Sequence, residues 1–218
     1  MAIPKTIFQT FKTTKLPLLT QWHVYRLKKK NPDYEYVFFD DEMISDFILK
    51  EFGQEVFDVY SKINIGAVKA DFFRYAVLYK RGGVYLDIDS LIVDKLDHFI
   101  RPDDSAVISL ERNDQYYIQY ALFFEAGHPF LKRTIEIAID NLKANRYPHN
   151  GHQMTGPTVF TAAIKECLEG ANPPAYRVMG YDYDDKVKFS YRGSKTVLYG
   201  FSRKTHWKKQ MKTSSVMK

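Results

Sequence analysis

The order of hydrophobic and polar positions along the chain predicts strands that alternate with helices. Residues 5–11 and the aromatic-rich residues 34–39 are expected to form strands. Each is followed by apolar positions at helical spacing, over 18–30 and over about 40–52, where the acidic residues that open the second stretch cap its helix. The apolar positions of the first helix are Leu19, Trp22, Val24, Tyr25 and Leu27. Strand, helix, strand, helix is typical of an α/β sheet with crossover connections.

Residues 64–89 combine a helix, a glycine cap and a buried strand. Asn64 is expected to cap a helix that Gly82 and Gly83 end, because glycine readily adopts the left-handed cap conformation. The apolar positions of this helix are Ile65, Val68, Phe72, Tyr75, Ala76 and Tyr79. A short apolar strand, 84–86, then runs directly into Asp87 and Asp89.

The second half of the chain predicts further strands and helices with less regularity. Strands are expected over 106–110 and 117–124, and helices over 129–144 and 157–168. Residues 172–209 are rich in tyrosine and mixed in charge, and their pattern predicts no particular element.

Length and composition fit one globular domain in a reducing compartment. The chain has 218 residues, of which 45% are hydrophobic and 27% charged. No apolar run approaches the roughly 20 residues of a membrane-spanning helix, so no transmembrane segment is expected. Residues 1–5 lack the apolar stretch of a signal peptide. Cys167 is the only cysteine, which excludes an internal disulfide, and we expect a cytoplasmic location.

The net charge of +6 is concentrated near the C-terminus. Residues 203–218 contain no acidic side chain, and their basic residues are Arg203, Lys204, Lys208, Lys209, Lys212 and Lys218. Without this tail the remaining chain is neutral, so no dedicated nucleic-acid partner is expected. The sequence therefore predicts one domain over residues 1–202 and a basic tail over 203–218.

Two carboxylates at the end of a buried strand are the clearest candidates for chemistry. Asp87 and Asp89 follow the apolar strand, and ligands bind at the carboxyl ends of strands in open α/β sheets. Carboxylates this close repel one another, and Mn²⁺ or Mg²⁺ would offset that repulsion and retain positions for phosphate oxygens. The alternative is a turn with two exposed acids. Asp71 and Arg74 lie three residues apart on the preceding helix and share a face, either as a surface ion pair or as an oriented polar pair.

The stretch from Ala70 to Tyr75 (Ala-Asp-Phe-Phe-Arg-Tyr), together with Gly82-Gly83-Val84-Tyr85-Leu86-Asp87-Ile88-Asp89, resembles a known family. It is similar to the family-32 glycosyltransferases with a DXD sugar-binding region and to the glucosylating domain of large clostridial toxins. Residues 3–11, 127–131 and 155–157 extend the resemblance, although Phe8 stands where the family usually has histidine. It covers about residues 3–165.

This resemblance implies a GT-A type α/β fold, Rossmann-like, in a single domain with a mixed central sheet. It implies a metal-dependent transfer of a hexose from a UDP- or GDP-linked donor to a glycan or glycoprotein acceptor, with retention of configuration. Asp87 and Asp89 would bind Mn²⁺ or Mg²⁺, with His206 as a third ligand. Gln119 stands where the family has asparagine and, with Asp89, is a candidate catalytic residue that would orient the acceptor or stabilise positive charge on the sugar. The donor-binding residues implied are Gln9, Thr10, Phe11, Asp71, Arg74, Tyr85, Asp87, Gly156 and Trp207.

Two other functions remain open at this point. Haloacid dehalogenase-like phosphatases also carry Asp-x-Asp after an apolar strand, but they usually have Thr or Val where this chain has Leu91, and they give Asp71 and Arg74 no role. A degenerate transferase that only binds nucleotide sugars or glycans is the other alternative. The basic tail, 203–218, is expected to close over the donor site if His206 and Trp207 take part.

Overall fold

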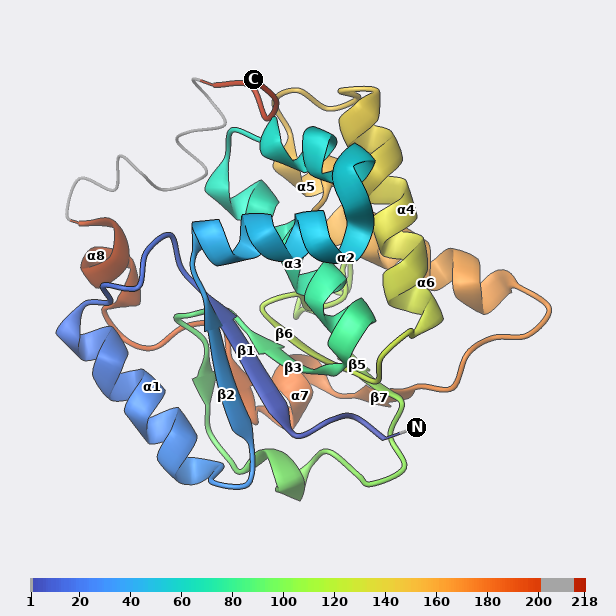
Figure 1. Ribbon diagram of the computed structural model, residues 1–218. Coiled ribbons are helices and arrows are strands. Elements are labelled where there is room, and N and C mark those ends of the chain that lie inside the picture. Colours follow the sequence, from blue (N-terminus) through green and yellow to red (C-terminus); the bar gives the residue numbers. More distant parts are fainter. Residues whose placement is uncertain (1, 201–213) are drawn as a thin grey trace.

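The computed structural model of the chain describes residues 2–200 and 214–218 (Figure 1). A six-stranded sheet lies at its centre, in the order β2-β1-β3-β6-β5-β7. Its strands are β1 (Thr6–Thr10), β2 (Glu35–Phe39), β3 (Gly83–Leu86), β5 (Ala106–Ser109), β6 (Ala121–Phe124) and β7 (Arg177–Met179). β1 pairs in parallel with β2 and β3, whereas β6 runs antiparallel to β3 and β5. The sheet is therefore mixed, as predicted.

Helices cover one face of this sheet, and shorter elements cover the other. The helices are α1 (Leu18–Lys30), α2 (Asp41–Ser61), α3 (Gly66–Arg81), α4 (Pro129–Lys143), α5 (Gly151–Met154), α6 (Pro157–Glu169), α7 (Tyr181–Asp184) and α8 (Ser194–Tyr199), with a 3-10 turn at Leu96–His98. Figure 1 shows α2, α3, α4 and α6 together on one side, and α1 apart from them beside β2. A second, two-stranded sheet joins β4 (Leu91–Ile92) to β8 (Val187–Lys188).

Apolar side chains on both faces explain why the strands read as continuous hydrophobic runs. Phe8 and Tyr85 point into the cluster formed with α2, α3, α4 and α6. Their neighbours Ile7 and Val84 point into a second cluster on the opposite face. Since successive side chains of a strand alternate between faces, β1 and β3 each contribute to two cores.

The glycine pair after α3 is required by close packing. Gly82 caps the helix with φ +64°, and Gly83 has φ +109°, both in the region that favours glycine. A Cβ on Gly83 would lie 2.7 Å from the carbonyl oxygen of Thr6. The glycines therefore allow β3 to start directly against β1, which places Asp87 at the end of a central strand.

Several element boundaries differ from the sequence prediction. Asn64 does not cap α3, since Ile65 occupies that position and the backbone NH of Asn64 donates to the carbonyl of Val216. Asp40 does cap α2 and accepts from the NH of Met43, but this helix continues beyond 52 to Ser61 across a kink at Gly53. The strand expected over 117–124 is shorter, because it pairs regularly only in β6.

The region without a predicted element, 172–209, contributes β7, α7, β8 and α8 as far as the structure describes it. The described C-terminal residues also have a defined place. Val216 is fully buried, and its NH donates to the carbonyl of Pro148. Over residues 2–200 and 214–218, no helix has both the length and the apolar character that crossing a bilayer requires.

Candidate functional site

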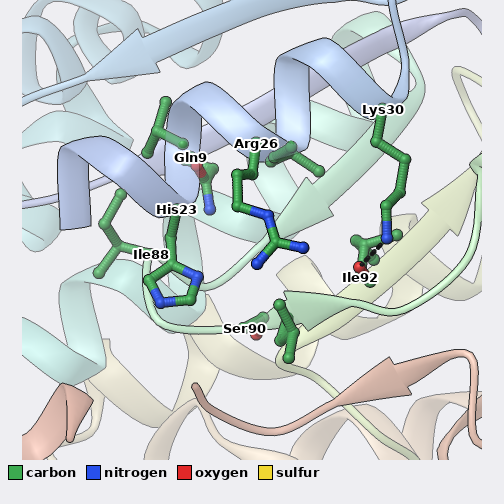
Figure 2. Close-up of a pocket in the computed structure, with 10 residues that line it drawn as sticks. Gln9, His23, Arg26, Lys30, Ile88, Ser90 and Ile92 are labelled. Atoms are coloured by element: carbon green, nitrogen blue, oxygen red, sulfur yellow. Dashed lines mark hydrogen bonds between the residues drawn. The ribbon is translucent and has the colours of Figure 1, made fainter. Parts of the chain in front are cut away.

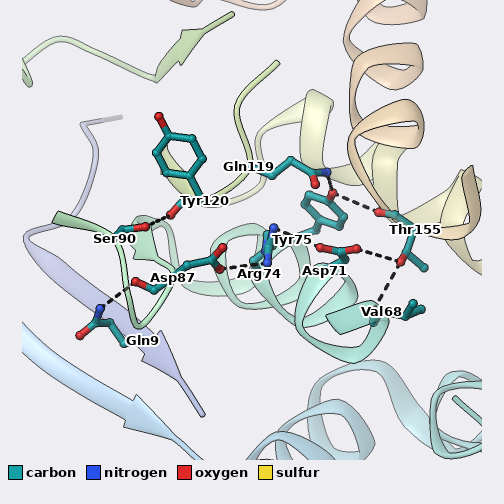
Figure 3. A network of polar contacts seen from close by, with 10 residues as sticks. All are labelled: Gln9, Val68, Asp71, Arg74, Tyr75, Asp87, Ser90, Gln119, Tyr120 and Thr155. Atoms are coloured by element: carbon teal, nitrogen blue, oxygen red, sulfur yellow. Dashed lines mark hydrogen bonds and ion pairs between the residues drawn. The ribbon is translucent and has the colours of Figure 1, made fainter. Parts of the chain in front are cut away.

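Arg74 is the centre of a buried polar network at the carboxyl end of β3 (Figure 3). Its guanidinium lies 3.1 Å from Asp71, one turn earlier on α3, and 3.0 Å from Asp87, just beyond β3. The guanidinium also lies over the ring of Tyr85, 5.2 Å from its centroid. Arg74 is only 6% exposed, so the pair predicted from helical spacing is a buried bridge and not a surface ion pair.

Burial makes the protonation of this network unusual. Desolvation raises the pKa of Asp71 to about 6, although the Arg74 charge lowers it. The pKa of Asp87 is also raised by burial, against the lowering effects of Arg74 and of the Tyr85 hydroxyl. The two acids hold the pKa of Arg74 above its ordinary value against its own desolvation, so the guanidinium remains charged.

Hydrogen bonds from three parts of the chain hold the backbone of Asp87. Its NH donates to the carbonyl of Tyr120 at 2.8 Å, and its carbonyl accepts from the NH of Ser90 at 2.9 Å. The side-chain amide of Gln9 donates to the same carbonyl at 3.1 Å, and its own oxygen accepts from the Tyr36 hydroxyl at 3.0 Å. β1, the residue before β6 and the turn after β3 thus hold the backbone that carries the Asp87 carboxylate.

Asp89 lies beside α8, an element that the sequence pattern did not predict. Burial and the charge of Asp87 raise the pKa of Asp89 to about 6, whereas Ser194 and Lys195 act to lower it. Tyr199, on the same helix, has its pKa raised to about 12, first by burial and then by Asp89 and Asp87. α8 therefore brings a hydroxyl, a cation and a phenol close to the carboxylate pair.

Gln119 joins the site through Tyr75. Its amide donates to the Tyr75 hydroxyl, which itself donates to the carbonyl of Thr155 at 3.1 Å. The Thr155 hydroxyl lies 3.4 Å from Asp71. Both Gln119 and Tyr75 are buried, and Figure 3 shows this chain of contacts continuing the network from Arg74 toward α6.

The remaining predicted residues have mainly supporting contacts. Thr10 is buried and donates to the carbonyl of Phe39, and the NH of Phe11 donates to the same carbonyl at 3.2 Å. Gly156 is the N-cap residue of α6, and a Cβ there would lie 2.8 Å from the Cα of His152. Tyr85 is 1% exposed beneath Arg74. His206 and Trp207 lie outside the described residues.

A separate hollow lies between α1 and the turn that follows the site (Figure 2). Its polar lining comes from Gln9, His23, Arg26, Lys30 and Ser90. Gln9 is common to both places, since its amide also holds the carbonyl of Asp87. The carboxylates of Asp87 and Asp89 do not line this hollow.

The segment that contains this network matches a known protein family. Residues 20–107, which include Asp71, Arg74, Asp87 and Asp89, match the family model of the glycosyltransferase sugar-binding region containing the DXD motif. The chain belongs to this family. The resemblance expected from the sequence is thus confirmed, and the Asp-x-Asp segment is the DXD motif of a glycosyltransferase family and not that of a phosphatase.

Curated relatives of this DXD glycosyltransferase family include fungal mannosyltransferases. "Inositol phosphoceramide mannosyltransferase 2" of Schizosaccharomyces pombe is 37% identical over 179 residues, which cover 80% of this chain and 50% of the relative. "Initiation-specific alpha-1,6-mannosyltransferase" of the same organism is 26% identical and covers 76% of this chain and 49% of the relative. The chain therefore spans about half the length of these relatives.

Solved structures of toxin glycosyltransferases share the fold. "PaToxG Glycosyltransferase" superposes with a TM-score of 0.64 at 22% identity, covering 76% of this chain and 70% of that one. The "UDP-bound glycosyltransferase domain from the YGT toxin" superposes with a TM-score of 0.56 at 9% identity, covering 82% and 79%. These likenesses confirm the predicted GT-A type fold with its mixed sheet.

The DXD carboxylates suit a hard divalent cation. Two partly exposed aspartates with raised pKa values supply oxygen ligands of the kind that Mn²⁺ and Mg²⁺ prefer. Within residues 2–200 and 214–218, no third His, Cys, Asp or Glu joins them in a cluster suited to a metal. The pair therefore fits an ion that takes its other ligands from the donor or from residues outside the described part.

Sequence reasoning missed Tyr75, Ser194, Lys195 and Tyr199 as residues of the site. Tyr75 has the spacing of a core position of α3, and only the three-dimensional contact with Gln119 distinguishes it. The α8 residues lie in the segment without clear periodicity, far along the chain from Asp89. The one local signal in the sequence was Gly193, which lies directly before this short helix.

Proposed function

We propose that the chain is a metal-dependent glycosyltransferase that moves a hexose from a UDP- or GDP-linked donor to a glycan or glycoprotein acceptor, with retention of configuration. The observation that carries this proposal is the buried Arg74 bridge between Asp71 and Asp87, directly beside Asp89 in the DXD motif. Mannose is the first hexose to test, because curated relatives are named mannosyltransferases. The cytoplasmic location remains a prediction from the sequence.

The Arg74 bridge would select and orient the donor sugar. Both oxygens of Asp71 are held in place, one by Arg74 and the other near Thr155, and each retains a lone pair that could accept from a hydroxyl of the sugar or ribose. Because the Arg74 guanidinium is bound by a carboxylate on each side, its remaining NH groups keep their orientation when a ligand binds. A site of this kind discriminates by hydroxyl position, since an unmatched polar group would be buried without a partner.

Asp87 and Asp89 would hold the cation. A Mn²⁺ or Mg²⁺ ion held by these carboxylates would supply positive charge that offsets the charge on the departing nucleoside diphosphate. Lys195 lies near Asp89 and would meet the same phosphate charge from α8. Tyr199 would cover the carboxylates from the side and limit the access of water.

Gln119 would act on the acceptor side of the sugar. As an amide it is a poor nucleophile, so retention by front-face attack, guided by the leaving phosphate, fits this residue better than a double displacement. Its amide is already oriented by the Tyr75 hydroxyl, which leaves its oxygen to accept from an acceptor hydroxyl or to face positive charge on the sugar ring. Gln9, Thr10 and Phe11 would support the base and ribose from the end of β1.

The basic tail, 203–218, would complete the site through His206 as a metal ligand and Trp207 as a donor contact. Deletion of the whole tail is a poor test, because it also removes the buried Val216. The single substitutions His206→Ala and Trp207→Ala keep Val216 in the chain. We expect both variants to weaken donor binding and to leave the melting temperature of the free protein unchanged.

Release of nucleoside diphosphate tests the proposed function. The protein is incubated with GDP-mannose, UDP-glucose and related donors, with and without Mn²⁺, and with simple glycosides as acceptors. We expect one donor to be consumed in a metal-dependent manner, and Asp89→Asn to abolish this. Arg133→Gln, on the exposed surface of α4, is the control that should retain activity. Donor binding without any product would instead support the degenerate binding module.

A further inference from the structure

The outward face of α1 carries large apolar side chains that no part of the described chain covers. Leu18 is 83% exposed, Trp22 is 49% exposed and Tyr25 is 60% exposed. Their spacing of four and three residues places them in one stripe on the helix, and Lys29 continues it. Trp22 and Tyr25 are among the apolar positions expected for this helix, yet Thr20 is its only fully buried residue.

The N-terminal segment that contains α1 is rich in positive charge. Residues 2–32 contain no acidic side chain, and their basic residues are Lys5, Lys12, Lys15, Arg26, Lys28, Lys29 and Lys30. Lys12, Lys15, Arg26, Lys28 and Lys29 are exposed. In the described chain none of these exposed cations forms a salt bridge, whereas Lys5 pairs with Asp97. The exposed surface of α1 formed by Leu18, Trp22, Tyr25, Lys28 and Lys29, with Arg26 at its edge beside the hollow, is called the α1 face below.

We propose that the α1 face docks on the surface of an anionic lipid bilayer. Trp and Tyr side chains favour the boundary between headgroups and acyl chains, where one end of the ring is apolar and the other is hydrated. An exposed leucine gains most by entering the acyl region, and lysines around it attract anionic headgroups. A helix that lies flat on a bilayer presents this combination of side chains.

Other occupants fit the α1 face less well. A second copy of the chain docked by the same face would bring two basic surfaces together, and like charges oppose that contact. A nucleic acid would use the aromatic rings as stacking platforms. The Arg26 guanidinium already lies over the Trp22 ring, 4.8 Å from its centroid, and Leu18 offers nothing to a base or a phosphate.

The inner side of α1 connects this face to the DXD site. Thr20 and the Tyr191 hydroxyl form a hydrogen bond of 2.7 Å, and the NH of Tyr191 donates to the carbonyl of Asp89 at 2.8 Å. Figure 1 shows α8, which approaches Asp89, next to the first turn of α1. Docking would therefore hold the site close to the bilayer. The docking itself does not depend on the proposed transferase activity.

Vesicle binding tests the proposal with the full chain. The probes are vesicles of phosphatidylcholine alone and vesicles in which about a third of the lipid is phosphatidylserine. We expect co-sedimentation with the anionic vesicles only, and its loss at high salt. In a Trp207→Phe background, Trp22 is the only tryptophan, so its fluorescence should shift to shorter wavelength on binding. This second readout needs no variant of the α1 face.

Matched pairs of variants distinguish an effect of the α1 face on vesicle binding from an effect of net charge. Lys28→Gln with Lys29→Gln should weaken binding about 30-fold, whereas Lys50→Gln with Lys132→Gln, exposed on α2 and α4, makes the same change in charge and should have little effect. Trp22→Ser with Tyr25→Ser should also weaken binding. The proposal would be overturned if both lysine pairs lost vesicle binding equally, or if the protein bound both kinds of vesicle equally. An unshifted Trp22 spectrum, or binding to RNA in place of vesicles, would also overturn it.

Discussion

Replacement of Arg74 by glutamine should destabilise the protein by about 3–5 kcal/mol at neutral pH. The guanidinium is the shared partner of Asp71 and Asp87, whose side chains are 15% and 26% exposed. Glutamine removes the charge and leaves two carboxylates close together in a poorly solvated place. For a chain of this size, the expected loss of unfolding free energy corresponds to a fall in melting temperature of roughly 6–20 °C.

The loss of stability should depend on pH, with a sign that follows from the pKa shifts. In the native protein the Arg74 charge lowers the pKa of both aspartates, yet the pKa of Asp71 is still raised to about 6. Without Arg74 these pKa values rise further in the folded state, while in the unfolded state they remain near 4. The folded variant then binds protons that the unfolded chain does not, so its stability falls as the pH rises through 4 toward and beyond 6.

Urea denaturation at pH 5 and pH 8, without divalent metal, measures this effect. We expect Arg74→Gln to lose clearly more free energy of unfolding at pH 8 than at pH 5. Arg133→Gln is the control, because Arg133 pairs with Glu136 and Glu166 at the surface and should contribute about 1 kcal/mol or less. An Arg74→Gln variant as stable as Arg133→Gln, or a loss that does not change with pH, would refute the reasoning.

Four further substitutions have definite expected results. At pH values above 6, Asp89→Asn should raise the melting temperature of the metal-free protein, because the pKa of this acid is raised to about 6 in the folded state. The same variant should lose any stabilisation by Mn²⁺. A lowered melting temperature of the metal-free variant would contradict this reasoning. Tyr75→Phe should reduce kcat about tenfold with little change in the KM for the donor, since it frees Gln119; an affected KM alone would argue against the positioning role. Gly83→Ala should destabilise by several kcal/mol in denaturant titrations, because its Cβ would lie 2.7 Å from a backbone oxygen. Val216→Asp should destabilise by about 3 kcal/mol or more by burying a charge, and an unchanged melting temperature would show that this end does not pack as described.

The part of the site carried by local pattern could be predicted from the sequence. Helical spacing puts Asp71 and Arg74 on one face of α3, and the glycine pair fixes where the helix stops and β3 begins. Asp87 and Asp89 then follow at the end of a strand whose residues are all buried. These features depend on residues within one short segment, so periodicity and cap chemistry are sufficient to place them.

The parts that depend on distant contacts could not be predicted. Nothing near Asp89 in the chain indicates that Ser194 and Lys195 approach it, because α8 is short and lies in a segment without periodicity. The helix boundary at Asn64 was misplaced for a similar reason. Its NH bonds to Val216 near the other end of the chain, which no local cap preference encodes.

The orientation of α1 shows how an apolar pattern can mislead. Its aromatic positions suggest a face turned toward the core, but the structure buries Thr20 and leaves Trp22 and Tyr25 exposed. The small side chain of Thr20 allows close approach to Tyr191, which binds it by a hydrogen bond. Hydrophobic spacing identifies the helix but does not say what its apolar face contacts.

A thermal-shift measurement of donor binding tests the central claim most directly. UDP, GDP and their sugar conjugates are each added with and without Mn²⁺ to the native protein and to Asp89→Asn. A ligand that binds only the folded state stabilises it by about 2.7 kcal/mol at a hundredfold excess over its Kd, which is a shift of roughly 5–10 °C here. We predict such a shift for one nucleotide class, dependent on Mn²⁺ and absent in Asp89→Asn. No metal-dependent shift with any of these nucleotides would contradict the assignment of the Asp71, Arg74, Asp87 and Asp89 network as a donor site.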